Sequence, residues 1–242
     1  MATIILIHGA WHGAWCWNQV STRLREAGHT PIALDLPGHG DNPKPLSGMT
    51  IEKYAAYVCS VLAALDTPAI LVGHSMGGMV ISQAAEAMPD KVQGLVYVCA
   101  VLLGNGETLQ DPAFADPDSR LAGNIGFSAD GSEVTLNPDA ITDLFYHDCP
   151  TEDADRAASL LCRQSAAPFA TPIHISTENF GRIPRYYVEC LNDRVLTPSL
   201  QKRMYERSPC KQVFSLDCGH SPFFAAPEEL TAIMDKISTM EN

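Results

Sequence analysis

Short apolar runs alternate with amphipathic helical patterns through the first hundred residues, and this alternation constrains the fold more than any other feature. Strands joined by helices pack as right-handed βαβ units, so the pattern predicts a parallel sheet with helices on both faces. The predicted strands are residues 3–7, 31–35, 69–73 and 94–100. The predicted helices between them are about 17–27, 51–65 and 76–88.

The alternation stops at residue 104 and resumes at residue 183, with strands at 185–191 and 212–216 and helices near 199–207 and 227–238. Between them lie helical patterns at 138–146 and 151–161, with many Pro, Gly and Asp residues. We therefore expect an α/β core of residues 1–103 and 183–242 with a helical cap insertion of residues 104–182. An insertion that follows a strand's carboxyl end lies over the crevice where such sheets bind ligands.

A serine lies in the sequence Gly73-His74-Ser75-Met76-Gly77-Gly78, directly after an apolar strand and at the start of a helix. This is the context of a G-x-S-x-G nucleophile elbow. The glycines leave space, because side chains at these positions would collide with the neighbouring strand and helix. We expect Ser75 to be the catalytic nucleophile.

A serine nucleophile needs a base, and the base needs an acid to orient it. His220 follows the last predicted strand and Asp193 follows the strand before it, which gives the chain order Ser, Asp, His. Asp217, three residues before His220, and Glu189, within a predicted strand, are the weaker candidates for the acid.

The developing oxyanion needs hydrogen-bond donors. The residue after the nucleophile, Met76, supplies one backbone N–H, and the glycine-containing loop after the first strand supplies the other, for which we select Ala10. Neither a phosphate-binding loop, a dinucleotide-binding motif nor paired metal ligands occur in the sequence, so we expect no cofactor and no metal.

The insertion offers aromatic and aliphatic side chains but no cluster of positive charge, which favours an apolar ester substrate. Phe114 and Tyr146 either line the pocket or attach the insertion to the core. The candidate substrate-binding residues are Trp11, His74, Leu102, Phe127, Leu144, Phe145, Leu196 and Phe223.

The charge balance, the apolar runs and the cysteines weigh against several kinds of partner and location. The 16 Lys and Arg residues against 28 Asp and Glu residues give a net charge of −12, which disfavours nucleic acid and anionic membranes. The longest apolar run, residues 95–103, is too short to cross a bilayer, and the first residues lack the basic segment of a signal peptide. Eight scattered cysteines without CxxC spacing indicate buried, reduced thiols, so we expect a cytoplasmic protein.

The motifs together resemble those of the α/β-hydrolase superfamily. They are His8-Gly9-Ala10-Trp11-His12-Gly13-Ala14-Trp15, Asp35-Leu36-Pro37-Gly38-His39-Gly40, the Ser75 motif, Asn192-Asp193 and Gly219-His220. More narrowly, they resemble plant methylesterases, the salicylate-binding esterase, hydroxynitrile lyases and bacterial carboxylesterases, some of which hydrolyse pyrethroid esters. The resemblance implies an α/β-hydrolase fold and a serine carboxylesterase that acts through an acyl-enzyme intermediate on a small-molecule ester.

Two alternatives stay open. Hydroxynitrile lyases of this group resemble one another in a threonine and a lysine at the positions of Gly9 and Ser221, so both residues disfavour cyanohydrin cleavage. A non-catalytic small-ligand receptor would need only the pocket, and the complete set of Ser75, Asp193 and His220 disfavours it. The oligomeric state is open, and a homodimer is compatible with the sequence.

Overall fold

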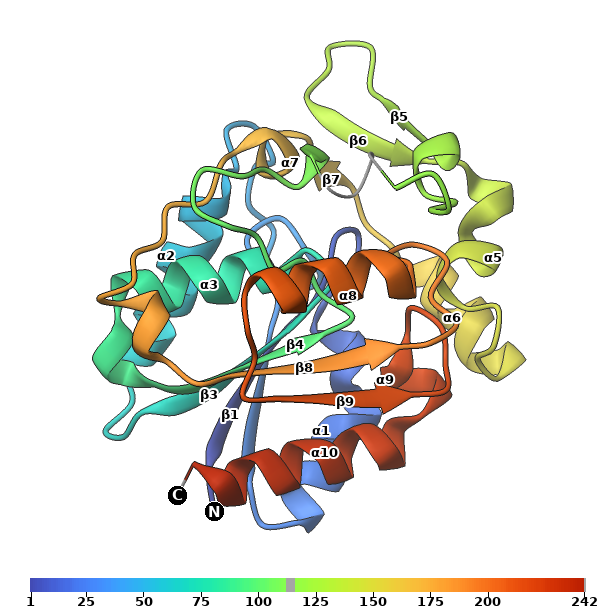
Figure 1. The fold of residues 1–242 in the computed structure, drawn as a ribbon. Coiled ribbons are helices and arrows are strands. Elements are labelled where there is room, and N and C mark those ends of the chain that lie inside the picture. The colour runs from blue at the N-terminus through green and yellow to red at the C-terminus, as the bar shows by residue number, and fades with distance from the viewer. Residues whose placement is uncertain (112–115, 242) are drawn as a thin grey trace.

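A computed structural model describes residues 1–111 and 116–241 and places a parallel sheet at the centre of the molecule (Figure 1). Each hydrogen-bonded pair of neighbouring strands in this sheet is parallel. The predicted parallel sheet is therefore confirmed. In spatial order its strands are β2 (Thr30–Leu34), β1 (Thr3–Ile7), β3 (Ala69–His74), β4 (Val92–Val98), β8 (Arg185–Cys190) and β9 (Gln212–Leu216).

Helices cover both faces of this sheet, as the alternating pattern predicts. One face carries α1 (Asn18–Glu26) and α10 (Pro227–Met240), and the other carries α2 (Ile51–Ala63), α3 (Gly77–Ala87) and α8 (Pro198–Arg207) (Figure 1). Gly28, just after the end of α1, has φ +88° and donates its N–H to the carbonyl of Arg25, as is typical of a glycine at a helix C-terminus. No helix within the described ranges is long and apolar enough to cross a membrane.

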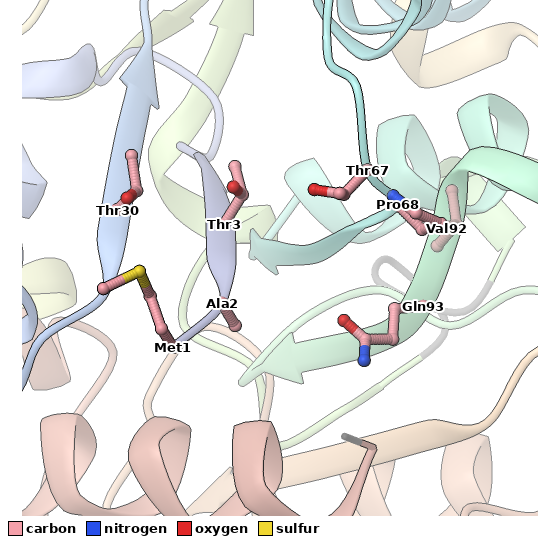
Figure 2. Close-up of a pocket in the computed structure, with 8 residues that line it drawn as sticks. All are labelled: Met1, Ala2, Thr3, Thr30, Thr67, Pro68, Val92 and Gln93. Carbon is pink, nitrogen blue, oxygen red and sulfur yellow. The ribbon is translucent and has the colours of Figure 1, made fainter.

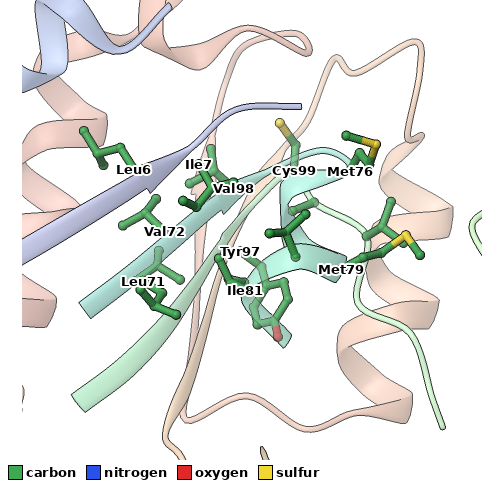
Figure 3. Packing of buried hydrophobic residues seen from close by; sticks show 14 of the residues in the cluster. Leu6, Ile7, Leu71, Val72, Met76, Met79, Ile81, Tyr97, Val98 and Cys99 are labelled. Carbon is green, nitrogen blue, oxygen red and sulfur yellow. The ribbon is translucent and has the colours of Figure 1, made fainter. Parts of the chain in front are cut away.

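The core packs β3 and β4 against α3, the helix that follows the serine. Leu71 and Tyr97 point to the face of the sheet that α3 covers, and Met79 and Ile81 of the helix belong to the same buried cluster (Figure 3). Val72, next to Leu71, points to the opposite face, where it is also fully buried. Burial of each such side chain stabilises the folded state by roughly 1.5–3 kcal/mol. This packing fixes the strand–turn–helix unit that carries Ser75.

The insertion differs from the helical cap that the sequence predicts, because it also contains a small antiparallel sheet above the core (Figure 1). Its strands have only three, four and two residues, too few to show a period-2 pattern in the sequence. They are β5 (Ile125–Phe127), β6 (Glu133–Leu136) and β7 (Gln164–Ser165), beside α5 (Ile141–Phe145), α6 (Thr151–Leu160) and α7 (Ala167–Ala170). Phe114, a candidate pocket residue, lies outside the described residues.

A hollow of about 430 Å³ lies at the amino-terminal ends of the strands, at the end of the sheet away from Ser75 (Figure 2). Threonines, short apolar side chains and Gln93 line it, and none of the lining side chains is ionisable. The side chains of this hollow therefore supply no acid or base for catalysis, and the expected catalytic residues follow the carboxyl ends of the strands.

Candidate active site

Ser75 occupies the sharp turn between β3 and α3 in a strained backbone conformation, with φ +51°. Such a conformation costs a non-glycine residue about 1–3 kcal/mol and persists where the surroundings enforce it. The Ser75 N–H donates to the carbonyl of Val98 over 3.3 Å, and the Ser75 carbonyl accepts from the N–H groups of Gly78 and Val101, each over 3.0 Å. Three backbone hydrogen bonds thus hold the turn.

The glycines around Ser75 are sterically required. A Cβ on Gly73 would lie 2.6 Å from the carbonyl oxygen of Gly77, and a Cβ on Gly77 would lie 2.8 Å from the carbonyl oxygen of Ile7. Side chains at both positions would therefore collide with the neighbouring helix and strand, which is the reason that the sequence suggests.

His220 and Asp193 lie on the loops after β9 and β8, and the structure brings them together. His220 Nδ1 donates to Asp193 Oδ2 over 2.7 Å, and the two side chains are 1% and 0% exposed. The other carboxylate oxygen, Oδ1, accepts from the backbone N–H groups of Val195 and Leu196 at 2.7 and 3.0 Å. These donors compensate for burial of the carboxylate charge.

The two weaker candidates for the acid face other partners. Asp217 accepts a hydrogen bond from Asn192 Nδ2 over 3.0 Å. Glu189 accepts from the hydroxyls of Tyr205 and Ser215. Of the three carboxylates weighed from the sequence, Asp193 is the one that contacts His220.

The two expected oxyanion donors belong to residues that line the same cavity as Ser75, namely Ala10 and Met76. Within the described residues, neither backbone N–H has a hydrogen-bond acceptor in the protein. The carbonyl oxygen of Gly9 lies 2.7 Å from His8 Nδ1, and in a planar trans peptide the N–H of Ala10 points the opposite way. Both N–H groups are thus free to bind a ligand atom.

Burial keeps three histidines around the serine uncharged. It lowers the pKa of His8 and of His74 well below the usual value, and it lowers the pKa of His12 to about 4. His8 Nε2 accepts from the N–H of Leu36, so His8 Nδ1 carries the proton that it donates to Gly9. His74 Nε2 donates to the carbonyl of His220 over 2.7 Å.

An apolar cavity of about 20 Å³ lies beside Ser75. It has room for about one water molecule, so an ester enters only as the lining side chains move apart. Two of the substrate-binding candidates, Trp11 and Leu196, line it. Five further lining residues are not among the candidates from the sequence, because they come from separate segments and no local pattern shows that these segments meet. They are Val101, Leu109, Leu121, Phe169 and Val195.

The remaining substrate-binding candidates do not line this cavity. His74 and Phe145 pack against the ring of His220, with centroids 4.7 and 5.7 Å away, and Phe223 packs on His74 at 4.9 Å. Leu102 and Leu144 are fully buried in the core. Phe127 on β5 is 56% exposed and lines a separate surface hollow of the insertion.

One group of side chains could hold a metal ion among the described residues: ligand atoms of His74, Cys99 and His220 lie within 4.8 Å of one another. Burial raises the pKa of the Cys99 thiol to about 12, which makes it a poor ligand. The nitrogens His74 Nε2 and His220 Nδ1 already donate to other groups.

All eight cysteines are free thiols. Four of them are buried, as the sequence predicts, and the other four are half-buried, which differs from the prediction.

Comparison with known proteins links this geometry to a family. A model described as the alpha/beta hydrolase family matches residues 4–233. A pyrethroid hydrolase of Sphingobium wenxiniae is 35% identical over 247 residues, which cover 96% of this chain and 86% of that protein. The crystal structure of a pyrethroid hydrolase from Sphingobium faniae matches with a TM-score of 0.88 and 32% identity, covering 98% of this chain and 97% of that one.

Plant proteins match over almost the whole chain as well. Putative methylesterase 11 of Arabidopsis thaliana, a chloroplastic protein, is 30% identical over 246 residues, which cover 97% of this chain. This chain spans 63% of the length of that protein and 56% of the length of the similar putative methylesterase 15.

Proposed function

Because the chain belongs to the alpha/beta hydrolase family, as its motifs predict, we propose that it is a serine carboxylesterase for small to medium apolar esters. One observation carries the proposal. Nδ1 of His220 is bound to a buried carboxylate of Asp193, which leaves Nε2 to act as a base toward Ser75 on its strained turn.

The reaction follows from these positions. Ser75 Oγ attacks the ester carbonyl while His220 Nε2 takes its proton, and the N–H groups of Ala10 and Met76 bind the developing oxyanion. His220 then gives the proton to the leaving alcohol, and the acyl group stays on Ser75. Water attacks this acyl-enzyme with His220 as base, which releases the acid and restores Ser75. Asp193 keeps the proton of His220 on Nδ1 and stabilises the imidazolium that forms twice.

The cavity walls support an uncharged, apolar substrate. Aliphatic side chains with Trp11 and Phe169 line the space beside Ser75, and no Lys or Arg is among the lining residues. A carboxylate or phosphate on the substrate would be desolvated there without a partner, which costs several kcal/mol. The similar proteins named methylesterase and pyrethroid hydrolase support ester cleavage.

Two positions weigh against cyanohydrin cleavage. A Cβ on Gly9 would lie 2.7 Å from the Cβ of Ser75, so the threonine typical of hydroxynitrile lyases has no room there. Ser221 is fully buried and uncharged, so it cannot stabilise a cyanide leaving group as a lysine would.

The test is turnover of p-nitrophenyl acetate and butyrate by the parent, by Ser75→Ala and by Ser60→Ala, which changes an exposed serine on α2. We expect Ser75→Ala to lower kcat by about 10⁴-fold or more and Ser60→Ala to match the parent. A fluorophosphonate should label the parent as Ser75 Oγ displaces fluoride, and should leave Ser75→Ala unlabelled. Full activity in Ser75→Ala, or cyanide release from mandelonitrile as the main reaction of the parent, would contradict the proposal.

A further inference from the structure

Trp11, next to the oxyanion donor Ala10, adopts a left-handed backbone conformation with φ +61°. An L-residue with a bulky side chain pays about 1–2 kcal/mol for this conformation, so the surroundings must enforce it. All three polar groups of Trp11 are bound by the insertion. Its N–H donates to Gln164 Oε1 over 3.3 Å, its carbonyl accepts from the N–H of Cys162 over 2.8 Å, and its indole N–H donates to the carbonyl of Val134 over 3.0 Å.

We propose that Gln164, a residue of the insertion, is a positioning residue that holds the oxyanion loop in its productive shape. This inference rests on the proposed function. The insertion then sets the geometry of catalysis, in addition to covering the pocket.

The path from Gln164 to Ala10 runs through two peptide planes. The plane between Ala10 and Trp11 is held at its carbonyl by His12 Nδ1 over 2.8 Å and at its N–H by Gln164 Oε1. The preceding plane is held at the Gly9 carbonyl by His8. The two rigid planes meet at Cα of Ala10, so the direction of the Ala10 N–H depends on how both planes are held. Loss of the Gln164 anchor leaves the plane between Ala10 and Trp11 held at its carbonyl alone, by His12, so this plane gains rotational freedom.

The side chain of Gln164 is itself fixed in place. It is fully buried, and Oε1 accepts a second hydrogen bond from His39 Nε2 over 3.0 Å while Nε2 donates to the carbonyl of Ser165. Burial lowers the pKa of His39, which keeps that ring neutral. An oxygen that accepts from two buried donors cannot be replaced by an apolar group without leaving both donors unpaired.

An oxyanion donor acts on the transition state more than on the bound ester, and a missing donor costs about 10²–10³-fold in kcat. A donor that is present but misdirected should cost less, about 10–100-fold, with little change in KM. A residue that merely attached the insertion would instead change stability, or KM through the shape of the pocket.

The experiment compares Gln164→Met, which removes the acceptor at similar volume, with Gln164→Glu, which keeps it. The control is Ser165→Ala, the next residue on β7, whose hydroxyl donates to the carbonyl of Met49 instead. Each variant is assayed for kcat and KM with p-nitrophenyl butyrate, for melting temperature, and for inhibition by an alkyl trifluoromethyl ketone. Ser75 Oγ adds to this ketone, its proton passes to His220, and the ketone oxygen becomes an oxyanion. The alkyl methyl ketone with the same alkyl chain is not activated for this addition, so its affinity measures binding of the ground state.

We expect Gln164→Met to lower kcat about 10–100-fold and to lower the affinity for the trifluoromethyl ketone by a similar factor. KM and the affinity for the methyl ketone should stay within about twofold of the parental values. Gln164→Glu should recover most of the loss, and Ser165→Ala should match the parent. An unchanged kcat in Gln164→Met, or a lower kcat with undiminished trifluoromethyl ketone affinity, would overturn the inference while the parent stays active. A parent that neither cleaves esters nor reacts with the ketone would overturn the proposed function and this inference together.

Discussion

Asp193 holds the ring of His220 through a hydrogen bond of 2.7 Å between Oδ2 and Nδ1, with both side chains almost completely buried. The bond places the proton of a neutral His220 on Nδ1, so Nε2 carries the lone pair that a base needs. Asp193 is held in turn by two backbone N–H groups of its own loop. The acid therefore keeps its orientation without help from the substrate.

We expect Asp193→Asn to lower kcat by about 10³–10⁴-fold, because an amide can hold the ring in the wrong tautomer and cannot stabilise the imidazolium. The matched control is Asp217→Asn, which changes a carboxylate three residues from His220 that bonds Asn192. It should retain parental activity. Steady-state kinetics on p-nitrophenyl butyrate measure both variants, and equal losses in the two would contradict the assignment of Asp193.

Gly9 should tolerate no side chain. A Cβ there would lie 2.7 Å from the Cβ of Ser75 and 3.0 Å from His74 Nδ1, so Gly9→Ala pushes the oxyanion loop away from the nucleophile. We expect kcat to fall by about 10²-fold or more, since removal of one oxyanion donor has that effect. The control is Gly123→Ala, where a Cβ meets nothing within 4 Å. Parental activity in Gly9→Ala would show that the loop has more freedom than its contacts indicate.

Tyr146 links the insertion to the oxyanion loop by donating its hydroxyl to His12 Nε2 over 2.8 Å. Burial raises the pKa of Tyr146, so the phenol keeps its proton. Tyr146→Phe leaves a buried nitrogen of His12 without a donor, and we expect the free energy of unfolding to fall by about 1–3 kcal/mol. Urea denaturation measures the change. The hydroxyl of Tyr205 donates to the half-buried Glu189, so Tyr205→Phe should lower the free energy of unfolding by less than Tyr146→Phe does. A larger decrease in Tyr205→Phe would count against this account.

The sequence predicts the parts of this protein whose signals are local. The predicted strand at residues 3–7 coincides with β1, and the Ser75 motif lies between β3 and α3 as expected. The insertion is different, because its strands are too short for periodicity to show and pair only through contacts between β5, β6 and β7. Gln164 could not be found from the sequence, since its role depends on Trp11, which is 153 residues away.

The pocket was the hardest part to predict. Aromatic residues of the insertion are equally suited to line a cavity or to pack a core, and composition cannot separate these roles. Phe145 packs on His220 behind the cavity, and Phe127 faces outward from β5. Phe169, which the sequence did not single out, lines the cavity because the short helix α7 turns it inward.

The buried histidines should make folding stability depend on pH. Burial lowers the pKa values of His8, His12, His39 and His74, whereas in the unfolded chain each titrates near 6.5. Below pH 6.5 the unfolded chain therefore binds more protons than the folded protein, and stability falls as the pH falls. The stabilising contribution is complete above pH 6.5. For His12, whose pKa is about 4, roughly 3 kcal/mol is lost between pH 6.5 and pH 4.

Urea denaturation at pH 7.5, 6.5, 5.5 and 5.0 measures this dependence, since most carboxylates stay ionised over that range and the slope reports histidines. We expect the free energy of unfolding to decrease at each step below pH 6.5, by up to about 1.4 kcal/mol per pH unit for each buried histidine. His12→Gln should reduce the slope because one titrating group is gone, whereas His174→Gln, at an exposed position, should leave it unchanged. Stability that stays constant from pH 7.5 to 5.0 would mean that these rings accept protons in the folded state as readily as in the unfolded chain.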